Sequence, residues 1–558
     1  MRVAWLASGA LAVAIALAVM LSAAVGAAKA SLINGTDGPD RLAGTGAADV
    51  ILGRGGNDTI DALAGDDFVT GGTGRDRVAG GAGNDRIGVH ADATPDFVRC
   101  GAGYDLVNAE LVDVVGIDCE VISRQLSRDP YTNFDSQHET QVEPDSFAFG
   151  NTIVATFQSG RFHGGGASNV GWATSKDAGV TWRSGFLPSQ SIFATPAGTR
   201  EIVSDPVVAY DALHRYWLIA TLARAPEGIE LLISRSRDGL AWSSPIVAAR
   251  DPTDTIDKEW IACDNWTSSR FRGRCYLSYL AGEPGSIVTQ TSSDGGSTWS
   301  APTGSTGPEA TGIVNGAQPV VQRNGTLVVL FATFFSRSVV DDQISAIRSA
   351  DGGRTFGPVH RVAALETEDI HGLRAPPLPS AEVDRAGRVY VAWSDCRFRD
   401  QCTANDIVLS KSLDAVTWTS PVRVPTGPVE ANPDYWVPGL AVDPATAGAS
   451  AKIAVAFHSS PYNCGYFASC PGVDVGLVTS SNGGRTWTRP QRLNVETMPL
   501  VWIAETGIGR MLGDYISTSY VAGKAIPVFS IAAEPPFEDS FRQAIFATTV
   551  SPVAARRR

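Results

Sequence analysis

The 558-residue sequence predicts an all-β protein built from two repetitive regions. In residues 34–107 an aspartate recurs at intervals of nine residues, and an apolar residue follows two positions after each one. In residues 142–550 a short turn-like sequence recurs every 57 to 69 residues. Each copy follows apolar runs that alternate with polar residues, which is typical of strands.

The first thirty residues differ from the rest of the chain. Arg2 precedes an apolar stretch, Val3–Val25, and Ala28-Lys29-Ala30 follows it. A charged start, an apolar middle and a small-x-small site are typical of a secretory signal, so we expect residues 1–30 to be removed and the protein to be secreted. The alternative is an uncleaved membrane anchor, because about 20 apolar residues can span a bilayer. No other stretch is apolar enough, so we expect no stable membrane span after cleavage.

The charge is concentrated in the first repetitive region. The net charge is −13, and residues 31–120 contain sixteen acidic residues against six arginines, which gives 6 − 16 = −10. Nucleic acid is therefore not an expected partner. We expect the following organisation: a first domain at 31–120, a linker or outer strand at 121–135, a second domain at 136–552 and a basic tail at 553–558.

The eight cysteines fall into four pairs that are close in sequence: Cys100 with Cys119, Cys263 with Cys275, Cys396 with Cys402, and Cys464 with Cys470. Local pairing is the simplest connectivity, and four disulfides fit an oxidising, extracellular compartment. A metal site is the weaker interpretation, because no Cys-x-x-Cys pair occurs and the chain has only seven histidines.

The residues that recur with the nine-residue period are suited to binding calcium. Its aspartates are Asp40, Asp49, Asp58, Asp67, Asp76 and Asp85, and Asp96 and Asp105 resume the period after an eleven-residue step. The apolar positions are Leu42, Ile51, Ile60, Val69, Val78, Ile87, Val98 and Val107. Aspartates and the carbonyls of glycine turns supply the hard oxygens that calcium prefers.

This pattern resembles the RTX (haemolysin-type) calcium repeat, Gly-Gly-x-Gly-x-Asp-x-apolar-x, most strictly at Gly71–Asp76 and Gly80–Asp85. The resemblance implies a parallel β-roll with two repeats per turn, a thin apolar core and calcium as the cofactor. Loops eighteen residues apart would then stack, with Asp40, Asp58 and Asp76 on one edge and Asp49, Asp67 and Asp85 on the other.

The match is not strict throughout, because Arg54 replaces a glycine and Ala62-Leu63-Ala64 replaces three motif positions. We therefore expect two to four ions, with folding coupled to binding because the apo segment repels itself. The alternative is a solenoid that has kept its shape and lost its metal.

The longer period has its clearest element in a short turn. Four copies have eight residues: SKDAGVTW (175–182), SSDGGSTW (292–299), SADGGRTF (349–356) and SSNGGRTW (480–487). Two are one residue shorter, SRDGLAW (236–242) and SLDAVTW (412–418). Paired strands precede each copy, so the unit predicts a four-stranded antiparallel blade.

These turns resemble the Asp boxes, or BNR repeats, of the sialidase superfamily. In such a box the aspartate and the Ser or Thr hydrogen-bond the turn and the aromatic residue packs between strands, so the box is structural. The resemblance implies a sialidase-like β-propeller. Seven inner strand pairs predict seven blades, although only six carry a box, and six blades is the alternative.

The sialidase resemblance extends weakly to the chemistry. That family clamps a carboxylate with an arginine triad and uses a tyrosine nucleophile, a glutamate and an acid/base aspartate. Val142-Glu143-Pro144 stands where an Arg-Ile-Pro motif is expected, and Gly160–Asn169 contains no aspartate. The residues that resemble family positions are catalytic candidates: Tyr515 as the nucleophile, Glu259 beside it, Asp514 in the same motif, and Arg374 or Arg510 as carboxylate ligands.

Three functions follow from these patterns. The first is a secreted, calcium-binding propeller that is directed at glycans, either binding them or cleaving them with a non-standard site. The second is a true exo-α-sialidase. The third is a non-catalytic adhesion or matrix protein. Glycans or glycoconjugates are the expected partners in each case, and the sequence leaves the sugar and the oligomeric state open.

Overall fold

The computed structural model describes residues 29–90, 92–282, 285–304, 313–334, 342–429, 433–460, 472–537 and 540–550. The chain divides into two compact units, residues 1–122 with 551–558, and residues 123–550. Most of the expected signal, the Cys464 to Cys470 pair and the basic tail lie outside the described residues. Each unit is described below by itself.

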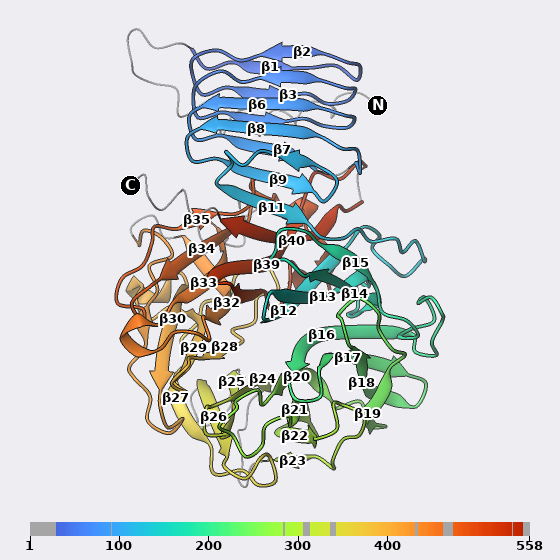
Figure 1. Ribbon diagram of the computed structural model, residues 1–558, viewed down its shortest axis with the longest axis vertical. Helices are drawn as coiled ribbons and strands as arrows, with labels where there is room; N and C mark the ends of the chain where they lie inside the picture. Colours follow the sequence, from blue (N-terminus) through green and yellow to red (C-terminus); the bar gives the residue numbers. More distant parts are fainter. Residues whose placement is uncertain are drawn as a thin grey trace, which may run out of the picture. The chain divides into compact units, whose positions relative to one another are not determined.

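The first unit is a parallel β-roll with two sheets of short strands (Figure 1). One sheet has the order β1-β3-β5-β7-β9, and its strands are β1 (Leu32–Asn34), β3 (Val50–Leu52), β5 (Phe68–Thr70), β7 (Arg86–Val89) and β9 (Leu106–Glu110). The other has the order β10-β8-β6-β4-β2, and its strands are β2 (Arg41–Ala43), β4 (Thr59–Asp61), β6 (Arg77–Ala82), β8 (Phe97–Ala102) and β10 (Val114–Val115). Up to β7, residues that pair across neighbouring strands, such as Ile51 and Val69, are eighteen residues apart in the sequence. The expected stacking of alternate repeats is therefore confirmed.

The core of the roll takes at least one apolar residue from each strand. Ile51, Ile60, Val69, Val78 and Ile87 are at most 3% exposed, and they form one cluster that continues to Val107. The disulfide Cys100–Cys119 lies at the C-terminal end of this cluster. The alternation of one inward residue with two outward residues explains why the short strands still form a continuous core.

The second unit consists of groups of four antiparallel strands that follow one another along the chain, and the first two groups are joined into one sheet by the pair Ala167 and Val203. The first two contain β12 (Gln141–Phe149), β13 (Thr152–Arg161), β14 (Ala167–Ser175) and β15 (Arg183–Phe186), then β16 (Ile202–Asp211), β17 (Tyr216–Ala225), β18 (Gly228–Ser236) and β19 (Ile246–Asp251). The next two contain β20 (Asp257–Cys263), β21 (Cys275–Ala281), β22 (Ser286–Ser292) and β23 (Thr303–Gly304), then β24 (Ile313–Val321), β25 (Leu327–Phe334), β26 (Gln343–Ser349) and β27 (His360–Ala364).

The later sheets repeat the same order. They contain β28 (Ser380–Val383), β29 (Val389–Asp395), β30 (Asp406–Ser412) and β31 (Val422–Arg423), then β32 (Asp434–Val442), β33 (Ile453–Ser460), β34 (Asp474–Ser480) and β35 (Gln491–Arg492). The last contains β38 (Ser517–Val521), β39 (Lys524–Ala532) and β40 (Gln543–Val550), and β40 also pairs with β11 (Val121–Gln125). A small hairpin, β36 (Glu505–Thr506) and β37 (Gly509–Arg510), precedes β38.

The first strands of these sheets form a closed ring. Each contacts the first strand of the next sheet, in the order β12, β16, β20, β24, β28, β32 and β38, and β38 contacts β12 again. Figure 1 shows the sheets succeeding one another around this ring. Residues 123–125 complete the last sheet, where Leu126 N–H donates to the Ile545 carbonyl and the Ser123 and Thr548 hydroxyls are 2.7 Å apart. The ring is the arrangement of blades in a propeller.

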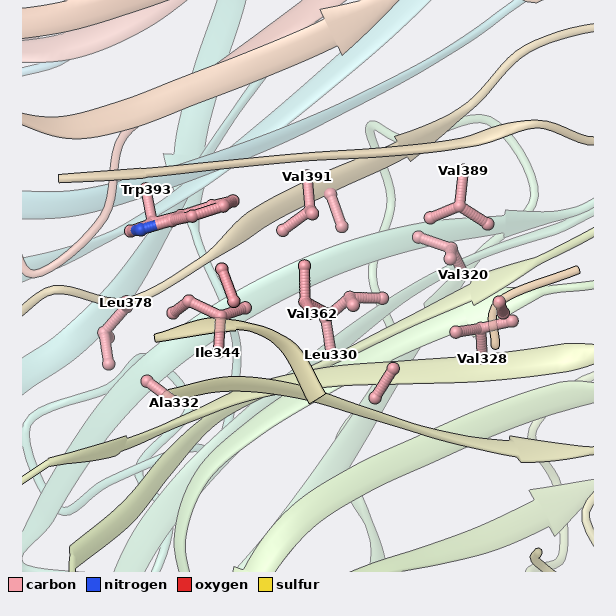
Figure 2. Packing of buried hydrophobic residues seen from close by; sticks show 14 of the residues in the cluster. Val320, Val328, Leu330, Ala332, Ile344, Val362, Leu378, Val389, Val391 and Trp393 are labelled. Carbon is pink, nitrogen blue, oxygen red and sulfur yellow. The ribbon is translucent and has the colours of Figure 1, made fainter. Parts of the chain in front are cut away.

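Apolar side chains fill the space between successive sheets. Figure 2 shows one such cluster, in which Val328 and Leu330 from β25 face Val389, Val391 and Trp393 from β29. Trp393 is fully buried. Side chains also hydrogen-bond across the gap between first strands; for example, the Gln318 amide oxygen accepts from the Ala381 N–H at 2.7 Å. Packing and these bonds together fix each sheet against its neighbour.

The recurring turns have the hydrogen bonds expected from their sequence. In the copy at 175–182, Asp177 accepts from the Thr181 N–H at 2.8 Å and the Thr181 hydroxyl at 2.6 Å, and Ser175 donates to Asp177. Asp294 and Asp351 make the corresponding bonds. The carboxylates of these aspartates therefore accept hydrogen bonds from their own turns, which they stabilise.

The all-β prediction is confirmed. Within the described ranges the helices are three single-turn 3₁₀ segments, Asp400–Cys402, Gly448–Ser450 and Leu500–Trp502. None of the helices in those ranges reaches the length and hydrophobicity that a membrane crossing requires. Besides Cys100–Cys119, the expected disulfides Cys263–Cys275 and Cys396–Cys402 are present.

Candidate functional site

The first strands of the ring share an irregularity that displays charged side chains. In β12, β16 and β20 the pairing register shifts in mid-strand, and the residues in the shift are Glu143, Asp205 and Lys258. Their φ angles are 53°, 49° and 49°, in the left-handed region. A β-bulge re-aims a side chain away from the regular alternation, and the left-handed conformation costs of order 1 kcal/mol or more for a non-glycine residue. β24 and β32 have the same shift, but with Gly316 and Val437.

Proline makes the bulge a consequence of the sequence. Pro144, Pro206 and Pro438 directly follow the left-handed residues of three of these strands. Proline cannot donate to a ladder hydrogen bond, so a strand with neighbours tolerates it mainly at a bulge.

Lys258 joins Asp205 and Tyr515 in a buried contact. Its ammonium lies 2.8 Å from an Asp205 carboxylate oxygen, and 3.5 Å from the centre of the Tyr515 ring. Lys258 is 3% exposed. Burial alone would lower the pKa of Lys258, but Asp205 and Glu143 reverse this and raise it, so the ammonium is charged.

Arg374 and Asp514 form a second ion pair beside the first. The Arg374 guanidinium donates to both Asp514 oxygens, with Nε–Oδ1 at 2.8 Å and Nη2–Oδ2 at 2.5 Å. The Arg374 side chain is 29% exposed, whereas Asp514 is buried. Both residues act electrostatically on Glu143, together with Lys258 and Asp205. We call Glu143, Asp205, Lys258, Arg374 and Asp514 the central charge cluster.

Glu143 is the group of the cluster that holds a proton at neutral pH. It is 2% exposed, and burial raises its pKa to about 8, although Lys258 acts in the opposite direction. The Gln158 amide donates to Glu143 and also, at 3.2 Å, to the Ser204 hydroxyl. The arrangement therefore places a Brønsted acid within the electrostatic reach of two cations, Lys258 and Arg374.

Glu259 follows Lys258 within the register shift of β20. It is fully buried, and neither of its carboxyl oxygens has a hydrogen-bond partner among the described residues. Burial raises the pKa of Glu259 well above its ordinary value, which favours the neutral carboxyl. A buried unpartnered carboxyl is costly, which is why such groups concentrate at functional sites.

The structure brings some of the sequence candidates together. Arg374 and Asp514 are paired, and Tyr515 lies against Lys258 and 5.1 Å from the ring of Trp260. The Tyr515 hydroxyl donates to the Pro206 carbonyl at 3.2 Å, and burial raises its pKa well above 10. Tyr515 is therefore not hydrogen-bonded to Glu259 here.

Arg510 instead binds groups of the neighbouring loop. Its guanidinium donates to the Ile503 carbonyl at 2.6 Å and to Glu505 at 2.5 Å. Its backbone is tied to the segment of Arg374, whose N–H donates to the Arg510 carbonyl. Sequence reasoning missed Asp205, Lys258 and the role of Glu143, and the signal that marks two of them is a charged residue directly before Pro144 or Pro206.

The roll contains a second set of ordered carboxylates. One oxygen of each aspartate accepts the N–H of an aspartate one coil earlier: Asp58 from Asp40, Asp76 from Asp58, Asp67 from Asp49 and Asp85 from Asp67, all at 2.7 to 2.9 Å. The ladders continue through Asp96 and Asp105, which accept from Asp76 and Asp85. We call these the carboxylate ladders.

The ladders fit calcium by the chemistry of their free oxygens. The second carboxylate oxygens of Asp58, Asp67, Asp76, Asp85 and Asp105 are buried without a partner among the described residues. Burial raises the pKa of Asp85 to about 6, of Asp105 to about 7 and of Asp96 to about 8, and neighbouring carboxylates act in the same direction. A cation at these oxygens would remove the penalty.

Side chains alone do not complete a metal site. In the part of the chain that the structure describes, no group of three or more His, Cys, Asp or Glu residues is arranged to hold a metal ion. Calcium takes about six to eight oxygens, so the turn carbonyls would have to supply the remainder. Glycine allows this close approach: a Cβ at Gly71 or Gly80 would lie 2.6 Å from the free oxygen of Asp76 or Asp85.

Residues 34–69 and 53–87 match the family described as RTX calcium-binding nonapeptide repeat (4 copies). The roll carries RTX calcium-binding repeats. No curated protein matches the sequence.

Several solved structures are similar to the chain at low identity. The Hadza microbial sialidase Hz136 is 16% identical with a TM-score of 0.37, and the match covers 74% of this chain and 66% of that one, just under two thirds of its length. The phage phi92 endosialidase is 12% identical with a TM-score of 0.42, covering 77% and 69%. The GH93 α-L-arabinofuranosidase of Fusarium graminearum is 13% identical with a TM-score of 0.37, covering 61% and 90%.

Proposed function

We propose that the protein is secreted, that its RTX roll binds calcium, and that its ring of sheets is a seven-bladed propeller that recognises glycans through the central charge cluster. The observation that carries the proposal is the convergence of five ionisable side chains, four of them at most 8% exposed, from separate sheets and loops of one ring. Burying this many charges is unfavourable unless the site has a use for them.

The composition of the cluster favours a hydroxyl-rich ligand. Arg374 and Lys258 are fixed donors, Asp205 and Asp514 are fixed acceptors, and both kinds lie in one site. A sugar presents alternating donors and acceptors, and charge-assisted hydrogen bonds to it are stronger than neutral ones. Trp260 and Tyr515 add aromatic surface beside the charges. A polyanion such as nucleic acid would instead need a field of one sign.

The protonated Glu143 supports glycoside hydrolysis as a second function. A general acid in a glycosidase is a carboxyl whose pKa is raised so that it can protonate the leaving oxygen. Glu143 meets this condition at neutral pH, and Asp205 and Asp514 are carboxylates that act electrostatically on it. An exo-α-sialidase with Tyr515 as the nucleophile is the more specific form of this proposal.

The test is glycan-array binding by the full chain in saturating calcium, together with turnover of fluorogenic glycosides that include a sialoside. Arg374→Lys keeps the charge but removes the two-point contact with Asp514, so we expect at least a tenfold loss of array binding. Arg485→Lys, at an exposed turn, is the matched control and should bind as the unchanged protein does.

The outcomes separate the functions. Turnover that Tyr515→Phe abolishes would support the sialidase, and turnover that only Glu143→Gln abolishes would support a different hydrolase. Binding without turnover on any glycoside would support a lectin-like or adhesive propeller. Retention of full binding by a folded Arg374→Lys protein would refute the assignment of the site.

A further inference from the structure

The turns of the roll fall into two classes. At Asp40 the second carboxylate oxygen accepts the N–H of Thr36 at 2.6 Å and its hydroxyl at 2.9 Å. At Asp49 the corresponding oxygen accepts the N–H of Thr45 at 2.5 Å. At Asp58, Asp67, Asp76, Asp85 and Asp105 the same oxygen is without a partner among the described residues, and each of these residues is at most 1% exposed.

The residue four positions before the aspartate distinguishes the classes. In the five turns with a free oxygen it is left-handed: Arg54 (φ 74°), Leu63 (72°), Gly72 (95°), Gly81 (106°) and Gly101 (101°). In the other two turns it is Thr36 or Thr45, neither of which has a positive φ. Because φ sets the direction of an N–H relative to the rest of its turn, the left-handed residue does not offer its N–H to the carboxylate as the threonines do.

Arg54 and Leu63 are informative because they depart from the glycine motif. A side chain in the left-handed region is strained by about 1 kcal/mol or more, and the surrounding fold must impose it. Both turns keep the conformation despite this, and both leave a buried oxygen free. The conformation, rather than the glycine itself, is thus the feature common to the five turns.

We propose that calcium binds in the turns of Asp58, Asp67, Asp76, Asp85 and Asp105, and that the turns of Asp40 and Asp49 form a metal-free first coil. The five carboxylates each offer a buried, unpartnered oxygen that a cation can satisfy. The two N-terminal carboxylates are already satisfied by Thr36 and Thr45, so a cation there would have to displace a backbone hydrogen bond.

This assignment differs from the repeat match in two ways. The match begins at residue 34 and so includes the turns of Asp40 and Asp49, which the proposal removes from the calcium sites. It ends at residue 87, and the proposal adds the turn of Asp105 beyond it. The first coil then resembles a terminal capping repeat, which closes a stack without needing a further neighbour.

The experiment measures bound calcium per full-length chain after equilibrium dialysis, and by calorimetric titration. Asp49→Asn and Asp67→Asn are a matched pair, because they are successive members of one ladder. We expect Asp49→Asn to keep the unchanged number of ions, and Asp67→Asn and Asp105→Asn each to lose at least one. Circular dichroism in saturating calcium establishes that each variant is folded.

A further variant tests the explanation without removing a carboxylate. Leu63→Thr installs at the Asp67 turn the residue type found at the Asp49 turn, so we expect it to fold and to lose an ion as Asp67→Asn does. The proposal is overturned if folded Asp49→Asn loses an ion, or if folded Leu63→Thr and Asp105→Asn both retain the full number. Should Asp67→Asn fail to fold, Leu63→Thr and Asp49→Asn still decide the question.

Discussion

Removing the ammonium of Lys258 should destabilise the propeller more than any surface change. Lys258 and Asp205 are 2.8 Å apart, with side-chain exposures of 3% and 12%. At an effective dielectric constant of about 20 their gross attraction is about 6 kcal/mol, from which desolvation subtracts. Lys258→Met leaves Asp205 as a buried, uncompensated charge, so we expect the free energy of unfolding to fall by about 3–5 kcal/mol.

The double variant makes the reasoning testable. Asp205→Asn combined with Lys258→Met leaves no unpaired charge, so it should be less destabilised than the sum of the two single variants by at least about 2 kcal/mol. The assay is urea unfolding followed by tryptophan fluorescence in saturating calcium. Lys524→Met, at an exposed position, is the control and should change the free energy by no more than about 0.5 kcal/mol.

The stability of the single variant Lys258→Met should also depend on pH. In the unchanged protein Lys258 lowers the pKa of Asp205 against the effect of burial. Without Lys258, only the Ser204 hydrogen bond and the charge of Arg374 oppose the effect of burial, so we expect the folded-state pKa of Asp205 to rise above its unfolded value. The folded variant then takes up a proton as the pH falls, and its deficit should shrink toward pH 5. Additive single effects, or a Lys258→Met cost below about 1 kcal/mol, would refute this account of the pair.

Three further outcomes are expected. Burial raises the pKa of Glu143 to about 8, so its contribution to stability declines as the pH rises through about 8; Glu143→Gln should remove that decline from melting curves recorded between pH 6 and 9. Calcium affinity should increase from pH 6 to pH 8, with proton release visible by calorimetry in buffers of different ionisation enthalpy, because the folded-state pKa of Asp85 is about 6 and that of Asp105 about 7. Ile60→Ala empties part of the thin roll core and should cost about 2–5 kcal/mol, lowering the melting transition of the roll while that of the propeller stays unchanged.

The carboxylate ladders were predictable from sequence as far as the period was regular. The nine-residue spacing of Asp40 to Asp85 indicates stacking on two edges, and the structure has it. The end of the ladders was not predictable, because the acceptor for the Asp105 N–H is Glu120, fifteen residues away rather than eighteen. Leu63 has a left-handed backbone conformation and Thr45 does not. The sequence does not predict this difference, because the residue type of a non-glycine residue is a poor guide to a positive φ.

The central charge cluster was predictable only in part. Arg374, Asp514 and Tyr515 were candidates through resemblance, and the structure places them near one another. Glu143 and Asp205 were not candidates, because the regular alternation of side chains along a strand does not predict the direction of a side chain within a bulge. Their following prolines carry the missing information, since a proline inside a strand that has neighbours on both sides requires a register shift.

The pairing of residues 123–125 with β40 bears on how the propeller is to be produced alone. A truncated chain that begins at residue 136, where the sequence predicts the start of the second domain, would lack the strand that joins its two ends. Its last sheet would expose the backbone groups of β40 as an unprotected edge, which invites association with other chains. A chain that begins at residue 121 keeps the Ser123 to Thr548 contact and covers the edge of β40, so we expect it to aggregate less than the shorter chain.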